Sequence, residues 1–276
     1  MIMDPLLQML LIKTHPLSAP VDYMLRLAKG QLYLPPYRLR DVGPTDFEAT
    51  GQEFLGLFVK LAKLRPDERV LDIGCGCGRI ALPLTGYLSR AGSYTGMDIT
   101  RKSIEWCQQN ITRRYPNFQF VQADLFSQRY NPTGRYLAKD YTFPLADKQF
   151  DFIFLTSVFT HMLPADVENY LREIARLLQE SGRALMTCFL LNEAQQRLAQ
   201  QGKNDINFQY GPGSYRLRNE AIPESAVAYQ ENFLIELIQK RGMEISGPIY
   251  YGAWSGRDDG LSYQDILLVK RSPVGY

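Results

Sequence analysis

Alternating glycines behind an aspartate form the part of this sequence with the clearest chemical meaning. Asp72 follows the apolar residues 70–71, and Gly74, Gly76 and Gly78 come after it at every second position. A strand that passes through a glycine-rich turn into a helix lets the backbone approach a ligand closely, because glycine lacks a Cβ atom and tolerates positive φ. The pattern predicts a nucleotide-type binding site after the first strand of a sheet.

Charge separates the two ligand classes that such a turn can bind. Residues 76–81 fit the spacing of a dinucleotide fingerprint, so an NAD-dependent oxidoreductase stays open as an alternative. Asp72 would lie close to the pyrophosphate of a dinucleotide and repel it. The same carboxylate suits S-adenosylmethionine, which carries an ammonium and a sulfonium group and no phosphate. Asp98 and Asp124, which end two later strand-like runs, strengthen this interpretation.

The stretch from Asp72 to Gly78 resembles the D/E-x-G-x-G-x-G motif of the class I S-adenosylmethionine-dependent methyltransferases. Residues 150–162 and 173–185 resemble the family's fourth-strand motif and its passage from a helix to the fifth strand. The resemblance covers residues 52–191 well and residues 225–270 by the order of elements. It implies S-adenosylmethionine as the cofactor and transfer of its methyl group as the reaction.

The resemblance also implies roles for the acids that end the strands. Asp98 would bind both ribose hydroxyls, and Asp124 would accept a hydrogen bond from the adenine amino group. The backbone near Leu125 would face the adenine ring, and Thr156 would line the methionine end. The residues expected to contact the cofactor are, in full, Asp72, Gly74, Cys75, Gly76, Gly78, Asp98, Ile99, Asp124, Leu125 and Thr156.

His161 is the candidate for a catalytic base. In-line methyl transfer from a sulfonium needs a well-placed nucleophile and exclusion of water, and a hydroxyl acceptor must also lose a proton. His161 follows the strand-like residues 150–155, at the edge where ligands bind in open α/β sheets, and its ordinary pKa suits the task. Packing near the cofactor is the alternative role. The other histidine, His15, is expected to lie on the surface.

The sequence between these residues predicts the elements that position them. Strand-like and helix-like runs alternate five times, and then come a helix over residues 225–241 and two strand-like runs over 243–254 and 264–270. Such alternation implies a parallel sheet covered on both faces. We expect an α/β, Rossmann-like, doubly wound sheet of seven strands, mostly parallel, with an antiparallel hairpin at its C-terminal edge.

Regions that depart from this alternation are expected to form the acceptor pocket. Residues 1–50 predict a partly helical cap, and a methyltransferase domain would span residues 51–276 with a substrate-side insertion at residues 192–223. The candidate substrate-binding residues are Tyr37, Tyr130, Tyr210, Tyr215 and Arg216. We expect a small-molecule acceptor that is methylated at oxygen. Methylation at carbon or nitrogen, and a non-catalytic cofactor-binding module, are the alternatives.

Composition narrows the partners and the environment. The formal net charge is +2 and no run of five basic residues occurs, so nucleic acid and membranes are not expected partners. The apolar residues 5–12 are too short to span a bilayer and predict a packing helix. Four cysteines and two histidines form no metal-ligand pattern, and this cysteine usage suits a reducing, cytoplasmic environment. A homodimer stays open.

Overall fold

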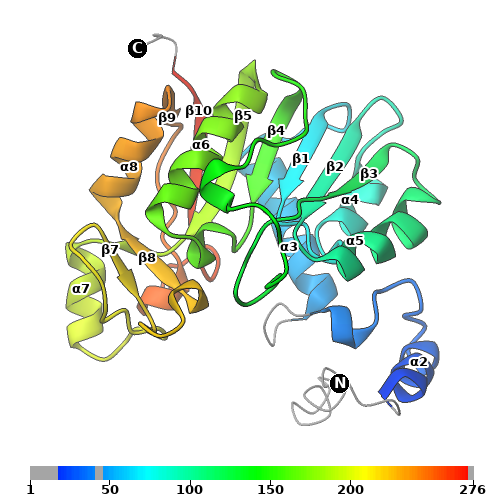
Figure 1. The fold of residues 1–276 in the computed structure, drawn as a ribbon, viewed down its shortest axis with the longest axis horizontal. Coiled ribbons are helices and arrows are strands. Elements are labelled where there is room, and N and C mark those ends of the chain that lie inside the picture. Colours follow the sequence, from blue (N-terminus) through cyan, green and yellow to red (C-terminus); the bar gives the residue numbers. More distant parts are fainter. Residues whose placement is uncertain (1–17, 41–45, 273–276) are drawn as a thin grey trace.

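A seven-stranded sheet forms the centre of the protein, as a computed structural model that describes residues 18–40 and 46–272 shows (Figure 1). The strand order is β3-β2-β1-β4-β5-β10-β9. Strands β1 to β5 run parallel to one another, and β10 runs antiparallel to both of its neighbours. The predicted doubly wound sheet with an antiparallel C-terminal edge is confirmed. The predicted helix at residues 5–12 and His15 lie outside the described residues.

Strands and helices alternate along the chain as the sequence predicts, except between β3 and β4, where a loop with a single 3₁₀ turn replaces a helix. The strands of the large sheet are β1 (Arg69–Ile73), β2 (Ser93–Asp98), β3 (Phe118–Gln122), β4 (Phe150–Leu155), β5 (Leu178–Cys188), β9 (Met243–Ile245) and β10 (Asp265–Arg271). The α-helices are α2 (Ser18–Ala28), α3 (Phe47–Lys60), α4 (Ala81–Tyr87), α5 (Arg101–Cys107), α6 (Pro164–Leu177), α7 (Glu193–Gln200) and α8 (Glu231–Lys240). A π-helical turn, η2 (Gln108–Thr112), continues α5. The 3₁₀ turns are η1 (Tyr37–Leu39), η3 (Ala138–Asp140), η4 (Phe159–His161), η5 (Pro223–Ser225) and η6 (Ala253–Ser255).

Side chains of the central strands alternate between two buried faces of the sheet. Leu71 and Ile73 of β1 pack with α6 and α8 on one face. Val70 of β1 and Phe152 and Phe154 of β4 pack with α3, α4 and α5 on the other. Because successive side chains of a strand point to opposite faces, burial of both faces requires continuous apolar runs. This explains why residues 152–155 of β4 are all apolar.

The strand order reverses at β1, and the crevice that holds the site opens there. β1 pairs with β2 on one side and with β4 on the other. Ligands of open α/β sheets bind outside the carboxyl ends of the strands at such a reversal. The sheet therefore brings the ends of β1, β2 and β4, with Asp72, Asp98 and Thr156, to one edge.

A second, three-stranded sheet corrects the prediction for residues 190–230. Its strands are β6 (Leu190–Leu191), β8 (Val227–Gln230) and β7 (Tyr215–Leu217), in that order. The sequence predicts one buried strand over residues 183–191, whereas the structure divides this run between the two sheets. The predicted helix over residues 225–241 is wrong at its start, because α8 begins at Glu231. The stretch 192–223, expected to be irregular, contains α7 and β7.

Burial explains the error at the start of α8. Val227, Ala228 and Tyr229 are three consecutive residues without exposed surface. A helix on the protein surface would turn one of them toward solvent, whereas a strand between two neighbours buries all three. Valine and tyrosine also favour strands.

In Figure 1 this small sheet and α7 lie at the lower left of the large sheet, and α2 lies at its lower right.

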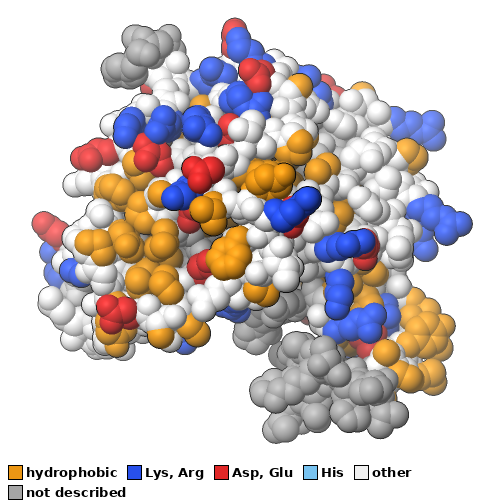
Figure 2. Space-filling view, viewed as in Figure 1, with side chains coloured by type: hydrophobic (Ala, Val, Ile, Leu, Met, Phe, Trp, Pro, Cys, Tyr) orange, Lys and Arg blue, Asp and Glu red, His pale blue; other side chains and the backbone are white. Residues whose placement is uncertain are grey.

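The described part of the N-terminal segment is tied together by a buried ion pair. Arg26 Nε donates to Asp22 Oδ2 at 2.8 Å, and Arg26 Nη1 donates to the carbonyl of Leu34 at 2.8 Å. Leu34 and Leu39 pack against Cys77 of the glycine loop. On the outer side of α2 apolar side chains are exposed, and Figure 2 shows hydrophobic side chains gathered over this helix. They are Val21, Tyr23, Met24 and Leu27.

Within the described ranges, every helix is too short or too polar to cross a bilayer. On the face drawn in Figure 2, positive and negative side chains are interspersed, as the small net charge predicts.

The buried ion pair between Arg183 and Glu68 provides a test of what holds the sheet together. Arg183 donates to both carboxylate oxygens of Glu68, at 3.0 and 2.7 Å, and Glu68 is 2% exposed. Removal of one partner leaves a buried charge unpaired, so Arg183→Leu should lower the free energy of unfolding by about 3–5 kcal/mol in urea denaturation.

Arg65→Leu is the matched control, because Arg65 also pairs with Glu68 but is 66% exposed. This variant should lower the free energy of unfolding by less than about 1 kcal/mol. If both variants lost the same free energy of unfolding, burial of the ion pair would not be the cause of its contribution to stability.

Candidate active site

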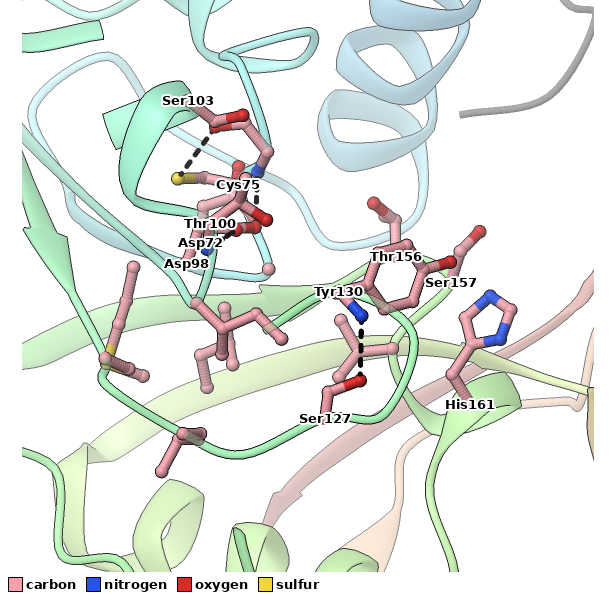
Figure 3. Close-up of a pocket in the computed structure, with 18 of the residues that line it drawn as sticks. Asp72, Cys75, Asp98, Thr100, Ser103, Ser127, Tyr130, Thr156, Ser157 and His161 are labelled. Carbon is pink, nitrogen blue, oxygen red and sulfur yellow. Dashed lines mark hydrogen bonds between the residues drawn. The ribbon is translucent and has the colours of Figure 1, made fainter. Parts of the chain in front are cut away.

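A cavity of about 400 Å³ lies at the carboxyl ends of β1, β2 and β4 (Figure 3). The glycine loop after β1, the end of β2, the loop after β3 and the segment from β4 to η4 line it. Arg38 and Leu39 of η1, Asp166 and Tyr170 of α6 and Glu224 of η5 also line it. Segments that are far apart in the sequence therefore meet at the cavity.

The glycine loop is held against the end of β2 by backbone hydrogen bonds. Gly74 N and Cys75 N both donate to the carbonyl of Met97, at 2.7 and 3.1 Å. Gly76 N donates to Asp98 Oδ2 at 2.8 Å. Gly74 and Gly76 have φ of +86° and +51°, which side chains other than glycine rarely adopt. The alternate glycines of the sequence are thus explained by the path of the loop.

Asp98 joins the glycine loop to the start of α5. Its Oδ1 accepts from Thr100 N at 2.7 Å, while Oδ2 accepts from Gly76 N. Each carboxylate oxygen has a second lone pair, so Asp98 can still accept hydrogen bonds from the two hydroxyls of a ribose. Burial raises the pKa of Asp98, and the backbone N–H groups of Thr100 and Gly76 oppose this shift.

Asp72 is a buried carboxylate with one oxygen left without a partner. The side chain is 1% exposed, and Tyr94 Oη donates to its Oδ2 at 2.6 Å. Oδ1 has no hydrogen bond, and burial raises the pKa of Asp72 to about 8. An ammonium group in the cavity would supply the missing donor and favour the charged carboxylate. The residues present therefore fit the ammonium end of S-adenosylmethionine.

His161 is held in one tautomer by the small-sheet part of the chain. Its Nδ1 lies 2.8 Å from the carbonyl oxygen of Glu224, which can only accept, so Nδ1 carries the proton and Nε2 keeps a lone pair. Burial lowers the pKa of His161, which keeps the imidazole neutral at pH 7. Tyr130 packs edge-on against the ring, with centroids 5.8 Å apart.

Ser127 and Glu224 join two loops beside His161. Ser127 Oγ donates to Glu224 Oε2 at 2.6 Å, and Tyr130 N donates to Ser127 Oγ at 3.2 Å. The loop after β3 is thus fastened to η5, whose carbonyl orients the histidine. Figure 3 shows Ser127, Tyr130 and His161 at one end of the cavity, away from Asp72 and Asp98.

Ser157 lines the cavity and has a strained backbone conformation. Its φ is +59°, and its N–H donates to Thr187 Oγ1 at 2.8 Å. Gln264 Oε1 accepts from the hydroxyls of both Ser157 and Thr187. These hydrogen bonds from β5 and from the segment before β10 hold a conformation that costs roughly 1–3 kcal/mol for a residue with a Cβ.

Most of the residues expected at the site line the cavity. Those brought together are Asp72, Gly74, Cys75, Gly76, Asp98, Ile99, Leu125, Tyr130, Thr156 and His161. Gly78 does not line the cavity. Its φ is +82°, and a Cβ at this position would meet Ile111 Cδ1 at 2.7 Å and Cys107 Sγ at 3.3 Å, so a larger residue would not fit.

Asp124 is turned away from the cavity lining. Its Oδ2 accepts from Arg135 Nε at 2.5 Å, and this hydrogen bond is the main cause that lowers the pKa of Asp124. The neighbouring Ala123, Leu125 and Phe126 do line the cavity. The contact of Asp124 with the adenine amino group stays a prediction.

Four of the five expected substrate-binding residues also lie off the cavity. Tyr37 is buried, with the Arg40 guanidinium 4.1 Å from its ring centroid. Tyr215 and Arg216 belong to β7, where they pair with β8, and Tyr210 forms a bridge with Leu217. Tyr210, Tyr215 and Arg216 therefore belong to the small sheet and its edge rather than to the cavity. Tyr130 is the one that lines the cavity.

Sequence reasoning did not single out several residues that complete the site. They are Tyr94, Ser127, Arg129, Asp166 and Glu224. Tyr94 is recognised only through its buried hydroxyl, which needs a partner. Arg129 directly precedes Tyr130 in the loop after β3. The position of this arginine beside a candidate tyrosine was the signal that could have identified it. Among the described residues no cluster of His, Cys, Asp and Glu could hold a metal ion.

Comparisons with known proteins agree with this geometry. Residues 70–182 match the family described as methyltransferase domain, and this range contains Asp72, Asp98 and Thr156. The uncharacterized methyltransferase YcgJ of Bacillus subtilis (strain 168) is 29% identical over 207 residues, which are 74% of this chain and 71% of the relative.

Solved structures with the same fold hold S-adenosylhomocysteine. Magnesium protoporphyrin IX methyltransferase of Synechocystis PCC 6803 is 16% identical with a TM-score of 0.53, over 92% of this chain and 99% of the other. The 1,6-didemethyltoxoflavin-N1-methyltransferase of Burkholderia thailandensis is 20% identical with a TM-score of 0.52, over 94% and 93%. At these identities the likeness shows the shared fold.

Replacement of Gly76 should separate cofactor binding from folding. A Cβ at Gly76 meets no protein atom within 4 Å, so Gly76→Ala should lower the free energy of unfolding by only about 1 kcal/mol. The added methyl group lies where the backbone borders the cavity. The affinity for S-adenosylhomocysteine, measured by calorimetry, should therefore fall at least about tenfold, roughly 1.4 kcal/mol.

Gly74→Ala is the contrasting variant, since its Cβ would overlap Val158 Cγ2 and its φ is +86°. Its free energy of unfolding should fall by more, about 2–3 kcal/mol. Unchanged affinity in Gly76→Ala would show that the loop does not approach the ligand.

The protonation of Asp72 should make cofactor affinity depend on pH. With a pKa of about 8, Asp72 is mostly neutral at pH 6, whereas an ammonium ligand binds its charged form. The affinity for S-adenosylhomocysteine should therefore rise up to about tenfold from pH 6 to 7. Methylthioadenosine, which keeps the ribose but lacks the ammonium, should show a smaller rise. Asp72→Asn should remove the difference between the two ligands, and a persisting difference would contradict this role.

Asp72 should also destabilise the protein without its cofactor as pH rises. Between its unfolded pKa of 3.8 and its folded pKa of about 8, the native state keeps a proton that the unfolded state loses. The free energy of unfolding therefore falls with pH over this range. In thermal unfolding at pH 7.5, cofactor-free Asp72→Asn should be more stable than the wild type, and a less stable variant would contradict the assignment.

Proposed function

We propose that this chain, which is a class I S-adenosylmethionine-dependent methyltransferase, methylates a hydroxyl oxygen of a small molecule. The observation that carries the choice of oxygen is the orientation of His161. Its Nδ1 is committed to the carbonyl of Glu224, and Nε2 is left as a hydrogen-bond acceptor on a residue that lines the cofactor cavity. A neutral imidazole with a free lone pair is the group that a hydroxyl acceptor needs.

The cofactor end and the acceptor end of the cavity have separate tasks. S-adenosylmethionine supplies an electrophilic methyl group on its sulfonium when it is bound. In this proposal Asp72 binds the ammonium group of the cofactor, which its unpaired Oδ1 supports, and Asp98 binds the ribose. At the other end, His161 Nε2 accepts the proton that the acceptor hydroxyl loses as oxygen takes the methyl group. The imidazolium then releases this proton to solvent.

The closure of the acceptor end favours a small molecule over a polymer. The Ser127–Glu224 hydrogen bond fastens the loop after β3 to η5 beside His161. Tyr130, from the same loop, packs against the histidine ring. A cavity covered in this way excludes water from the transferred methyl group and admits an acceptor of limited size.

Removal of the imidazole should separate catalysis from cofactor binding. His161→Ala should lower kcat by about 10²–10⁴-fold, the usual contribution of a general base, with formation of S-adenosylhomocysteine as the measurement. Its affinity for S-adenosylhomocysteine should stay within about twofold of the wild type. His161→Asn keeps a donor for the Glu224 carbonyl but has no base, so it should lose as much activity as His161→Ala.

The pH profile gives an independent readout of the same residue. Because burial lowers the pKa of His161 below its ordinary 6.5, the wild-type kcat should be constant near neutrality and fall where the imidazole takes up a proton, below pH 6.5. The residual activity of His161→Asn should lack this fall. Equal losses of activity and cofactor affinity would make His161 a binding residue. A product methylated at nitrogen or carbon would overturn the oxygen assignment.

A further inference from the structure

We infer that the methyl acceptor carries a carboxylate and that Arg129 binds it. The inference rests on the proposed function, because it concerns the acceptor end of the same cavity. Arg129 lies in the loop after β3, lines the cavity and directly precedes Tyr130. The acceptor class that these groups favour is a small hydroxy acid with an apolar or aromatic body.

Each carboxylate that lines the cavity has a hydrogen-bond partner other than Arg129. Asp98 accepts two backbone N–H groups, and Asp72 faces the ammonium end of the cofactor. Glu224 accepts the hydroxyl of Ser127, and Asp166 accepts the N–H of Leu163 at the start of α6. None of these acids forms an ion pair with Arg129, which has no carboxylate within 4.0 Å among the described residues.

The other cations of the lining belong to the cofactor end. Lys102 follows Thr100, whose N–H is bound to the ribose-binding Asp98. Arg79 follows the glycine loop, and Arg38 adjoins Leu39, which packs against Cys77 of that loop. Arg129 is therefore the cation left on the acceptor side.

Packing places the exposed Arg129 side chain beside the ring that contacts His161. The Arg129 guanidinium carbon lies 4.9 Å from the centroid of the Tyr130 ring, and this ring packs edge-on against His161 at 5.8 Å. Stacking on an aromatic ring restricts a guanidinium and leaves its N–H groups free for a carboxylate, which it can bind with two parallel hydrogen bonds. A hydroxy acid can span from this guanidinium to His161 Nε2 along the tyrosine.

Binding of an anion at Arg129 would also make His161 a stronger base. Burial is the main cause that lowers the pKa of His161, and the positive charge of Arg129 lowers it further. A substrate carboxylate would neutralise that charge and make proton uptake by the imidazole easier. An acceptor with a carboxylate would therefore prepare His161 for its task, whereas a neutral acceptor would not.

Paired ligands test the subsite without requiring turnover. The probes are 4-hydroxybenzoate, 3-hydroxybenzoate and 3-(4-hydroxyphenyl)propionate, each compared with its neutral amide. They are titrated against the full chain saturated with S-adenosylhomocysteine, and Kd is measured by calorimetry. In the wild type, at least one acid should bind at least about tenfold more tightly than its amide, the order expected for a charged hydrogen-bonded pair.

Arg129→Gln should bring the Kd ratio of acid to amide within about twofold of unity, and Arg129→Lys should keep part of the preference. The affinity for S-adenosylhomocysteine should stay unchanged in both variants. Arg90→Gln is the matched control, because Arg90 is an exposed arginine before β2, at the opposite end of the strand from the cavity. It should bind every probe like the wild type.

Two results would overturn the subsite. In one, no acid binds more tightly than its amide in the wild type. In the other, the preference survives in Arg129→Gln. Failure of the proposed function has a different signature. Suppose that an acid binds through Arg129 but its methylated product carries the methyl group on carbon or nitrogen, or that no product forms while the acid and S-adenosylmethionine are both bound. In either case the oxygen assignment fails and the subsite stands.

Discussion

The carboxylate of Asp98 is the constraint on which the site depends. It binds Gly76 N at 2.8 Å and Thr100 N at 2.7 Å, so one side chain fixes both the glycine loop and the start of α5. The loop can take this path because Gly74 and Gly76 adopt positive φ. A side chain at the end of β2 thereby aligns the loop after β1, and the cofactor end of the cavity follows from the pairing of these two strands.

The core stabilises a site that contains several unfavourable groups. Asp72 is a buried acid with an oxygen lacking a partner, and Ser157 has a backbone conformation that is costly for a residue with a Cβ. Both line the cavity. Such costs persist because the two buried faces of the sheet supply the stability that the site lacks. A ligand that supplies the missing partner of Asp72 removes one of these costs.

The cofactor end could be predicted from the sequence because its signals are local. The glycines stand next to Asp72, and Asp98 ends the strand that pairs with β1, so alternation of strands and helices was sufficient to bring these residues together. The prediction for Asp124 used the same logic. Its carboxylate binds Arg135, eleven residues further along the loop after β3, and no periodicity in the sequence marks that contact.

The small sheet over residues 190–230 could not be predicted in the same way, because its strands depend on partners far away in the sequence. β8 lies between β6 and β7, and the buried run of Val227, Ala228 and Tyr229 reads as helix or strand until those neighbours are known. Tyr215 and Arg216 were expected at the acceptor pocket, whereas they form β7. Composition identified the region without identifying its structure.

The acceptor end is built from contacts of this long-range kind. Ser127 and Glu224 are 97 residues apart, and the carbonyl that orients His161 lies 63 residues beyond it. Because Glu224 is held by the small sheet, changes in that sheet can move the acceptor end while Asp72, Asp98 and the glycine loop keep their places on β1 and β2. The cofactor end is set by the strand ends of the core, and the acceptor end by segments added around it. A fold arranged in this way can keep one cofactor and change its acceptor, since the two depend on different parts of the chain.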